Sequence, residues 1–287
     1  FMKNTIEVRN VSKTYPGFRL DNVSFTIPEG AVVGLIGENG AGKTTTLKAI
    51  LNMIKFDGEI KVFGKDSKNC EKEIKEELGV VLDDSFLSEY LTAKQMNKVM
   101  KQFYKNWDED KYFAYLKEFQ LPEDKIVKEF SSGMKMKLKI ATALSHHPKA
   151  LILDEATSGL DPIIRNEILD IFRKYILEEE SRSVLLSSHI TTDLEQIADY
   201  IIFIHQGKIV FFLPATDLLE NYGIVKCDEK EFQHLEKKDY ISYRKDKYSY
   251  QVLVSDKDMV KKKYRFTVID KPSIEDIMLF YVKGEGK

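Results

Sequence analysis

Hydrophobic and polar side chains alternate over residues 5–30, and this alternation predicts short antiparallel strands with one buried face. A turn at Pro28-Glu29-Gly30 then leads into the continuous apolar run Ala31–Ile36. Such a run is typical of a central strand that is covered on both faces. A glycine-rich loop, Gly37–Gly42, follows this strand directly.

The rest of the first 205 residues combines strand-like and helical segments. From Leu91 to Leu144 only helical patterns occur, with a break near Leu121-Pro122. On both sides of this helical insertion strands and helices alternate, which predicts a parallel sheet of the phosphate-binding type. The expected strands are Gly58–Gly64, Gly79–Leu82, Ala150–Leu153, Ser183–Ser187 and Tyr200–Ile204, and the expected helices are Lys43 to about Ile54, about Cys70–Leu78, Pro162–Leu177 and Thr191–Ala198.

The chain changes character at about Tyr222, where lysine, tyrosine and aspartate become more frequent. Strand-like pieces occur at Tyr248–Val254 and Tyr264–Ile269, and Ser273 is well placed to cap a last helix with one apolar face. We therefore expect residues 222–287 to form a small α+β accessory domain. Residues 1–221 are expected to form the main domain, with a helical subdomain at about 85–145.

Composition adds limits on function. The 44 basic and 46 acidic residues give a net charge of -2, which argues against a nucleic-acid binder that relies on a global positive field. No apolar run approaches the roughly 18 residues that span a bilayer, and the N-terminus lacks a signal-peptide pattern. The two cysteines, Cys70 and Cys227, lack metal-ligand spacing, as in a cytosolic protein with unpaired thiols. Membrane association is therefore expected only through a partner.

The loop after the first buried strand carries the strongest chemical signal. Its residues match G-x-x-x-x-G-K-[ST] in full, in the order Gly37, Glu38, Asn39, Gly40, Ala41, Gly42, Lys43 and Thr44. Glycines let backbone N–H groups converge on a β-phosphate, and the following helix presents the positive end of its dipole. Lys43 is placed to neutralise phosphate charge, and the Thr44 hydroxyl is placed to ligate Mg²⁺.

A second signal lies at the end of the strand Ala150–Leu153, where two carboxylates follow in succession. A carboxylate at the end of a buried strand is costly unless it meets a cation. Mg²⁺ beside the phosphate loop supplies one, so Asp154 is expected to hold the metal. Glu155 is expected to act as the general base toward an attacking water.

These motifs resemble the nucleotide-binding domain of ABC transporters over about Ile6–Phe212. The resemblance implies an α/β fold with a P-loop NTPase (RecA-like) core, an N-terminal antiparallel β subdomain and an inserted α-helical subdomain. It implies ATP and Mg²⁺ as ligands, with Thr45 also in the ATP site. It further implies a homodimer or heterodimer of ATPase subunits, bound to a separate membrane permease at the cytoplasmic face of the membrane.

Further residues take their roles from this resemblance. Phe130-Ser131-Ser132-Gly133-Met134 resembles the signature loop, in which Ser131, Ser132 and Gly133 contact ATP on the opposite subunit. Ser158-Gly159-Leu160-Asp161 resembles the D-loop at the dimer interface, although Asp161-Pro162 also has the form of an ordinary helix start. His189 matches the switch histidine that contacts the γ-phosphate, and Tyr15 matches the aromatic residue that stacks on adenine.

Two positions depart from the usual family pattern. Asp83 stands where the Q-loop glutamine is expected, where it can still serve Mg²⁺ or the attacking water, and Met134 replaces the last glutamine of the signature. Both features resemble a bacterial branch that exports antibiotics, peptides and lipid-linked compounds. Two alternatives remain: a soluble ABC-type ATPase and a nucleotide-binding regulator with poor hydrolysis.

Overall fold

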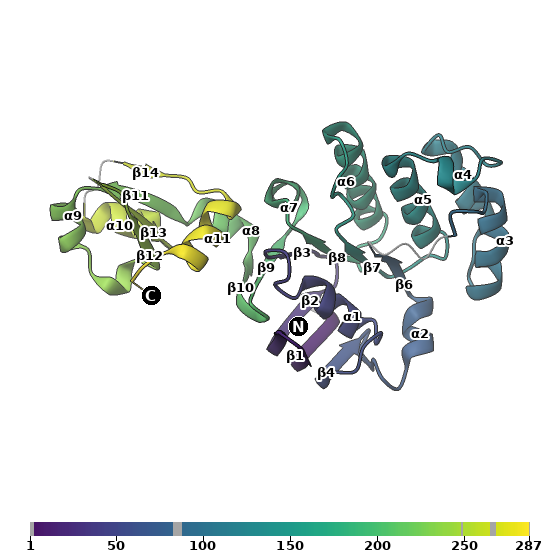
Figure 1. Ribbon diagram of the computed structural model, residues 1–287, viewed down its shortest axis with the longest axis horizontal. Helices are drawn as coiled ribbons and strands as arrows, with labels where there is room; N and C mark the ends of the chain where they lie inside the picture. Colours follow the sequence, from purple (N-terminus) through teal and green to yellow (C-terminus); the bar gives the residue numbers. More distant parts are fainter. Residues whose placement is uncertain (1–2, 83–87, 248, 265–267, 287) are drawn as a thin grey trace.

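The computed structural model describes residues 3–82, 88–247, 249–264 and 268–286, and it contains three β-sheets (Figure 1). The first is an antiparallel sheet with the strand order β2-β1-β4-β5. Its strands bear out the alternation at the start of the chain, because the side chains that point inward from β1 and β2 are buried in one core cluster. The bounds are β1 Asn4–Tyr15, β2 Phe18–Pro28, β4 Asp57–Val62 and β5 Lys65–Asp66.

The central sheet has six strands in the order β10-β9-β3-β8-β7-β6. Its five strands from β9 to β6 are parallel, and β3, β7 and β8 are buried along their whole length, as continuous apolar runs predict. The strands are β3 Val32–Ile36, β6 Leu78–Val81, β7 Ala150–Asp154, β8 Ser183–Ser188, β9 Tyr200–His205 and β10 Lys208–Pro214. The helices associated with them are α1 Lys43–Ile50, α2 Glu71–Glu76, α6 Pro162–Leu177 and α7 Thr191–Ile197.

The antiparallel edge strand β10 was not anticipated from the sequence. It is joined to β9 by Gln206 and Gly207, which both have positive φ angles of 47° and 75°. Two such residues in succession form the turn whose twist suits a two-residue hairpin. A glycine at this turn is also required by space, because a Cβ atom on Gly207 would lie 1.8 Å from the carbonyl oxygen of Arg19.

The helical insertion lies at the end of the central sheet next to β6 (Figure 1). It contains α3 Ala93–Phe103, α4 Glu109–Glu118, the 3₁₀ turn η1 Val127–Glu129 and α5 Ser132–Leu144. The expected break near Leu121-Pro122 falls between α4 and η1. Within the described ranges of the chain, no helix is both long and apolar enough to cross a membrane.

The third sheet has the order β12-β13-β11-β14 and is followed by the last helix, α11. The expected strand Tyr264–Ile269 is wrong at its start, because Tyr264 ends a helix, α10, whose lysines offered no clear apolar face to the sequence pattern. The elements are α8 Ala215–Glu220, β11 Gly223–Cys227, α9 Glu229–His234, η2 Lys237–Asp239, β12 Ser242–Lys245, β13 Tyr250–Val254, α10 Lys257–Tyr264, β14 Ile269–Asp270 and α11 Ile274–Lys283.

Helix α11 returns to the central part of the molecule and lies between the third sheet and α8 (Figure 1). Its start is a capping box formed by Ser273 and Asp276, as its sequence indicates. Ile274, Ile277 and Phe280 are almost fully buried in the same core cluster as residues of α7, β9 and α8. The backbone N–H of Ile274 also donates to Glu195 of α7 at 2.8 Å. The last helix is therefore packed on the element that follows β8.

Candidate functional site

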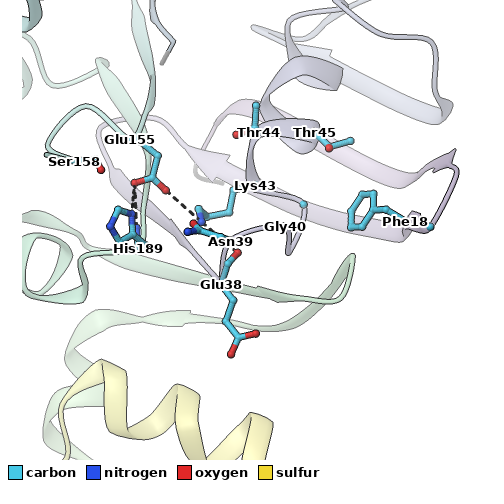
Figure 2. A pocket seen from close by; sticks show the side chains of 12 residues that line it. Phe18, Glu38, Asn39, Gly40, Lys43, Thr44, Thr45, Glu155, Ser158 and His189 are labelled. Atoms are coloured by element: carbon cyan, nitrogen blue, oxygen red, sulfur yellow. Dashed lines mark hydrogen bonds and ion pairs between the residues drawn. The ribbon is translucent and has the colours of Figure 1, made fainter. Parts of the chain in front are cut away.

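The residues with chemical signals meet where β3, β7 and β8 reach their carboxyl ends. Parallel neighbours in a sheet bring the loops after these strands together at one edge. A cavity of about 720 Å³ lies there (Figure 2). Its lining consists of Gly17, Phe18, Glu38, Asn39, Gly40, Gly42, Lys43, Thr44, Thr45, Glu155, Ser158 and His189.

The loop between β3 and α1 needs glycine at particular places. A Cβ atom on Gly37 would lie 2.4 Å from the carbonyl oxygen of Ile204. Gly42 has a φ angle of 116°, and a Cβ atom there would lie 3.0 Å from Phe18 Cζ. Because the loop packs this tightly, it turns back on itself and Lys43 can reach its carbonyl groups. Lys43 Nζ donates to the carbonyl oxygen of Gly37 at 2.8 Å.

A chain of oxygen contacts connects α1, β7 and β8 beneath the cavity. The Thr44 hydroxyl donates to Asp154 Oδ2 at 2.8 Å, and the Ser187 hydroxyl donates to Asp154 Oδ1 at 2.5 Å. Asp154 and Ser187 are direct partners in the parallel ladder, so the second bond fixes the carboxylate on its strand. Asp154 is 2% exposed, and both of its oxygens therefore depend on these two hydroxyls.

Glu155 stands at the centre of the cavity, between a cation and an imidazole (Figure 2). Its Oε1 lies 3.3 Å from Lys43 Nζ, and its Oε2 lies 2.7 Å from His189 Nδ1. The backbone of Glu155 has a φ angle of 53°, a left-handed conformation that is strained for a residue with a side chain. Its N–H donates to the carbonyl oxygen of Ser187 at 3.1 Å, which holds the strained residue in place.

The side chains of Lys43, Glu155 and His189 differ in their exposure to solvent. The side chain of Lys43 is 6% exposed, that of Glu155 is 15% exposed, and that of His189 is 45% exposed. A buried ammonium next to a mostly buried carboxylate interacts more strongly than the same pair in water. The exposed imidazole lies at the mouth of the cavity. An anionic group that enters the cavity therefore meets a buried ammonium group and an exposed imidazole.

The structure brings together most of the residues that the sequence singled out. Ten of them line the same cavity, and Asp154 is hydrogen-bonded to one of these, Thr44. Asp83 lies outside the described residues. The side chain of Ser131 accepts from the N–H of Met134 and thereby caps α5, and neither Ser132 nor Gly133 lines the cavity. This separation is what the resemblance implies, since the signature loop is expected to act on the opposite subunit.

The remaining predicted positions have local roles. Asp161 caps α6 through the N–H groups of Ile163 and Ile164, each at 3.1 Å, and only Ser158 of the D-loop segment lines the cavity. Tyr15 is 39% exposed beside the cavity, and Lys13 Nζ lies 5.2 Å from the centre of its ring. Its role in stacking on adenine stays a prediction.

Three residues of the site were missed from the sequence, namely Gly17, Phe18 and Ser187. Phe18 lies opposite Tyr15 in the β1–β2 ladder, and it lines the cavity, whereas Tyr15 does not. An aromatic residue only three positions from the predicted one was the available signal. Ser187 is the next-to-last residue of the buried strand β8, where a serine indicates no particular chemistry, so its bond to Asp154 could not be foreseen.

Comparison with known proteins places this arrangement in context. A family model described as "ABC transporter" matches residues 20–158. The bacitracin transport ATP-binding protein BcrA of Bacillus licheniformis is 33% identical over 222 residues, which cover 76% of this chain and 72% of that protein. The lantibiotic transport ATP-binding protein SrtF of Streptococcus pyogenes is 36% identical over 210 residues, which cover 71% of this chain and 89% of that protein.

The fold has counterparts among solved structures. The structure of an ATP-binding subunit of an ABC transporter superposes with a TM-score of 0.67 at 27% sequence identity. The match covers 75% of this chain and 91% of the other. The P-loop NTPase fold expected from the motifs is therefore confirmed.

Proposed function

Because this chain belongs to the ATP-binding proteins of ABC transporters, we propose that Lys43, Glu155 and His189 carry out ATP hydrolysis in the cavity at the carboxyl ends of β3, β7 and β8. The observation that carries this assignment is the continuous contact from Lys43 through Glu155 to His189. Proteins of this family are ATPases coupled to transport.

ATP binding depends on the glycine loop and Lys43. The loop offers backbone N–H groups to the phosphates, and α1 begins at Lys43 with its positive dipole end toward the cavity. Lys43 turns from Glu155 to the β- and γ-phosphates, since these carry more negative charge than one carboxylate. Thr45 and the exposed Tyr15 complete the ATP site.

Hydrolysis depends on Glu155 as the general base. A water bound at its carboxylate loses a proton to Glu155 while its oxygen bonds to the γ-phosphorus, and the bond from this phosphorus to the bridging oxygen of ADP breaks. ADP and phosphate are the products. His189, hydrogen-bonded to Glu155, orients this carboxylate before ATP arrives and contacts the γ-phosphate afterwards. Asp83 is proposed to assist at the same place.

Thr44 and Asp154 fit a bound Mg²⁺. Their oxygens are 2.8 Å apart and lie beside the phosphate loop, and hard oxygen ligands are those that Mg²⁺ prefers. Among the described residues no group of three or more His, Cys, Asp or Glu side chains gathers to hold a metal, so these two residues would share the ion with phosphate oxygens and water. When bound, Mg²⁺ neutralises phosphate charge.

The remaining roles involve other chains. Ser131 caps α5, and Ser132 and Gly133 begin this helix, away from the cavity. We infer that these three residues complete the site of an opposite ATPase subunit, with residues 158–161 at the interface. The permease is proposed to dock near α3, where Phe103 is 72% exposed beside a cavity of about 500 Å³ that includes Tyr104.

The names of BcrA and SrtF, which are a bacitracin and a lantibiotic transport protein, support export of a peptide or antibiotic.

The test compares the wild-type protein with Glu155→Gln, which keeps the shape of the side chain and removes the base. We expect phosphate release from MgATP to fall by about 100-fold or more, and we expect light scattering to show an ATP-bound dimer. Glu220→Gln, which alters an exposed carboxylate on α8, is the matched control. Wild-type protein without ATPase activity, both alone and with its permease, would instead indicate a nucleotide-binding regulator.

A further inference from the structure

Three buried polar atoms without a hydrogen-bond partner lie around the carboxyl group of Asp193. In the described ranges of the chain, seven buried side-chain nitrogen or oxygen atoms make no hydrogen bond. Three of these seven are Thr157 Oγ1, Arg165 Nε and Asp193 Oδ2. Arg165 Nε lies 3.8 Å from Asp193 Oδ2, and the Thr157 hydroxyl is near enough to the Asp193 carboxyl to influence its pKa. Such a concentration of unsatisfied groups is unusual in a core.

The three residues come from segments that carry the proposed ATPase chemistry. Thr157 stands two positions after Glu155, and Asp193 stands four positions after His189 in the first turn of α7. Arg165 lies in α6, four positions after Asp161. The cluster is therefore the place where the segment after the general base, the segment after the switch histidine and the start of α6 meet.

Arg165 extends this contact to the D-loop segment. Its Nη2 donates to the carbonyl oxygen of Leu160 at 3.1 Å, so one guanidinium faces both Asp193 and the backbone of residues 158–161. An arginine is suited to this task because its donors are fixed in a planar fork. A displacement of α7 would thus be transmitted through Asp193 and Arg165 to Leu160.

Burial of the Asp193 carboxyl group next to Arg165 costs free energy, because a buried charge loses its contact with water. The side chain of Asp193 is 2% exposed, and burial is the main cause that raises its pKa, which Thr157, Arg165 and His189 oppose. A buried charge pair contributes little net stability, and it fixes geometry when it is retained. Helix α7 is also held from another side, because Glu195 accepts from the backbone N–H of Ile274. The contact between Arg165 and Asp193 therefore connects α6 and α7, two helices that are otherwise held by apolar packing.

We propose that Asp193 and Arg165 are positioning residues that keep the D-loop segment 158–161 in register with the Glu155–His189 pair. This inference rests on the proposed ATPase function. Neither side chain lines the cavity, so their effect on the reaction is indirect. ATP binding uses the glycine loop and Lys43, which neither Asp193 nor Arg165 contacts. Hydrolysis, in contrast, requires the D-loop segment 158–161 to be correctly placed. The pair should therefore govern kcat and leave KM for ATP nearly unchanged.

The experiment measures kcat and KM of Asp193→Asn, Arg165→Gln and the double variant, all in the full-length chain. We expect kcat to fall by about tenfold or more in each single variant, because small misplacements of reacting groups have effects of this size or larger. KM for ATP should stay within about twofold of wild type. The double variant should lose no more than the worse single variant, since both changes break the same contact.

The matched control is Asp170→Asn, which breaks an exposed ion pair with Arg173 on the same helix. Thr157→Val, which keeps the shape of the side chain, provides a milder change if Asp193→Asn fails to fold. A lowered melting temperature with unchanged kcat would assign the pair a merely structural role and overturn the inference. Additive losses in the double variant would also overturn it. If the wild-type chain does not hydrolyse ATP, the proposed function itself fails, and the two failures are thus distinguished.

Discussion

The amino group of Lys43 lies 3.3 Å from Oε1 of Glu155, so the residue proposed to bind phosphate and the residue proposed to activate water are paired with each other. On the proposed function, this ion pair occupies the part of the cavity that the phosphates of ATP enter. ATP binding then exchanges a carboxylate for phosphate groups at Lys43, and it leaves Glu155 free to accept a proton. In this proposal, the Lys43–Glu155 pair couples the arrival of the nucleotide to the release of the Glu155 carboxylate.

Replacing Glu155 with Gln should strengthen ATP binding as well as stop hydrolysis. The change frees Lys43 and removes one negative charge near the γ-phosphate, which favours binding by roughly 1 kcal/mol, or about fivefold in Kd. Fluorescent ATP titrations without Mg²⁺ would measure this effect. Glu220→Gln should leave Kd unchanged. Equal or weaker binding by Glu155→Gln would show that the ion pair does not compete with the nucleotide.

His189→Ala should slow hydrolysis without weakening ATP binding to the same degree. The imidazole holds Oε2 of Glu155 at 2.7 Å, and a base that loses its orientation transfers protons less efficiently. We expect single-turnover hydrolysis to slow by about 100-fold, with Kd for ATP within about threefold of wild type. His234→Ala on the exposed helix α9 is the control. A matching loss in Kd would mean that His189 serves binding only.

The two aromatic residues of the first hairpin should respond differently to substitution. Tyr15→Ala should weaken ATP and GTP binding alike, by about 1–3 kcal/mol, because stacking is tolerant of the base. Tyr15→Phe should restore both. Phe18→Ala should instead lower the melting temperature of the nucleotide-free protein, because Phe18 packs against Gly42. Calorimetry and nucleotide titrations separate the two outcomes. Loss of binding only in Phe18→Ala would transfer the stacking role to Phe18.

His146 should make the protein sensitive to mild acid. It is buried and stacked on Tyr104 with ring centroids 4.0 Å apart, and burial lowers its pKa to about 4 from an ordinary 6.5. Between these pH values the unfolded chain binds the proton and the folded chain does not. The contribution of His146 to stability is therefore complete above pH 6.5 and declines as the pH falls toward 4, by at most about 3 kcal/mol.

Urea unfolding from pH 7 to pH 4 measures this dependence. We expect His146→Phe, which keeps an aromatic ring next to Tyr104, to have a shallower decline than the wild-type protein. His234→Phe should follow the wild-type curve, because His234 is exposed on α9. Parallel curves for His146→Phe and wild type would contradict the assignment.

The order of elements was predictable wherever the pattern of burial was simple. Helix α6 has the expected bounds, since Asp161 and Pro162 start it clearly. Helix α1 ends at Ile50, four residues before the expected end, because Asn52 adopts a positive φ that no periodicity indicates. Strand β10 was missed although its Gln206-Gly207 turn was a usable signal.

The candidate site was predictable in its members and less so in its contacts. Motif order, together with the meeting of parallel strands at their carboxyl ends, was enough to place Lys43, Asp154, Glu155 and His189 together. The pairing of Glu155 with Lys43 depends on the left-handed backbone at Glu155, which follows from its surroundings. A contact between residues more than a hundred positions apart leaves no trace in a single sequence.

The packing of α11 on α7 also bears on how the chain is made. Synthesis delivers the residues of the cavity first, and Ile274, Ile277 and Phe280 reach the core cluster only once α11 has been made. Until then an apolar face of the first 221 residues has no cover. A nascent chain, or one truncated before α11, would therefore present this face to chaperones and proteases, whereas α11 hides it once it has been made. Packing of α11 thus removes an apolar surface that would otherwise favour aggregation or proteolysis.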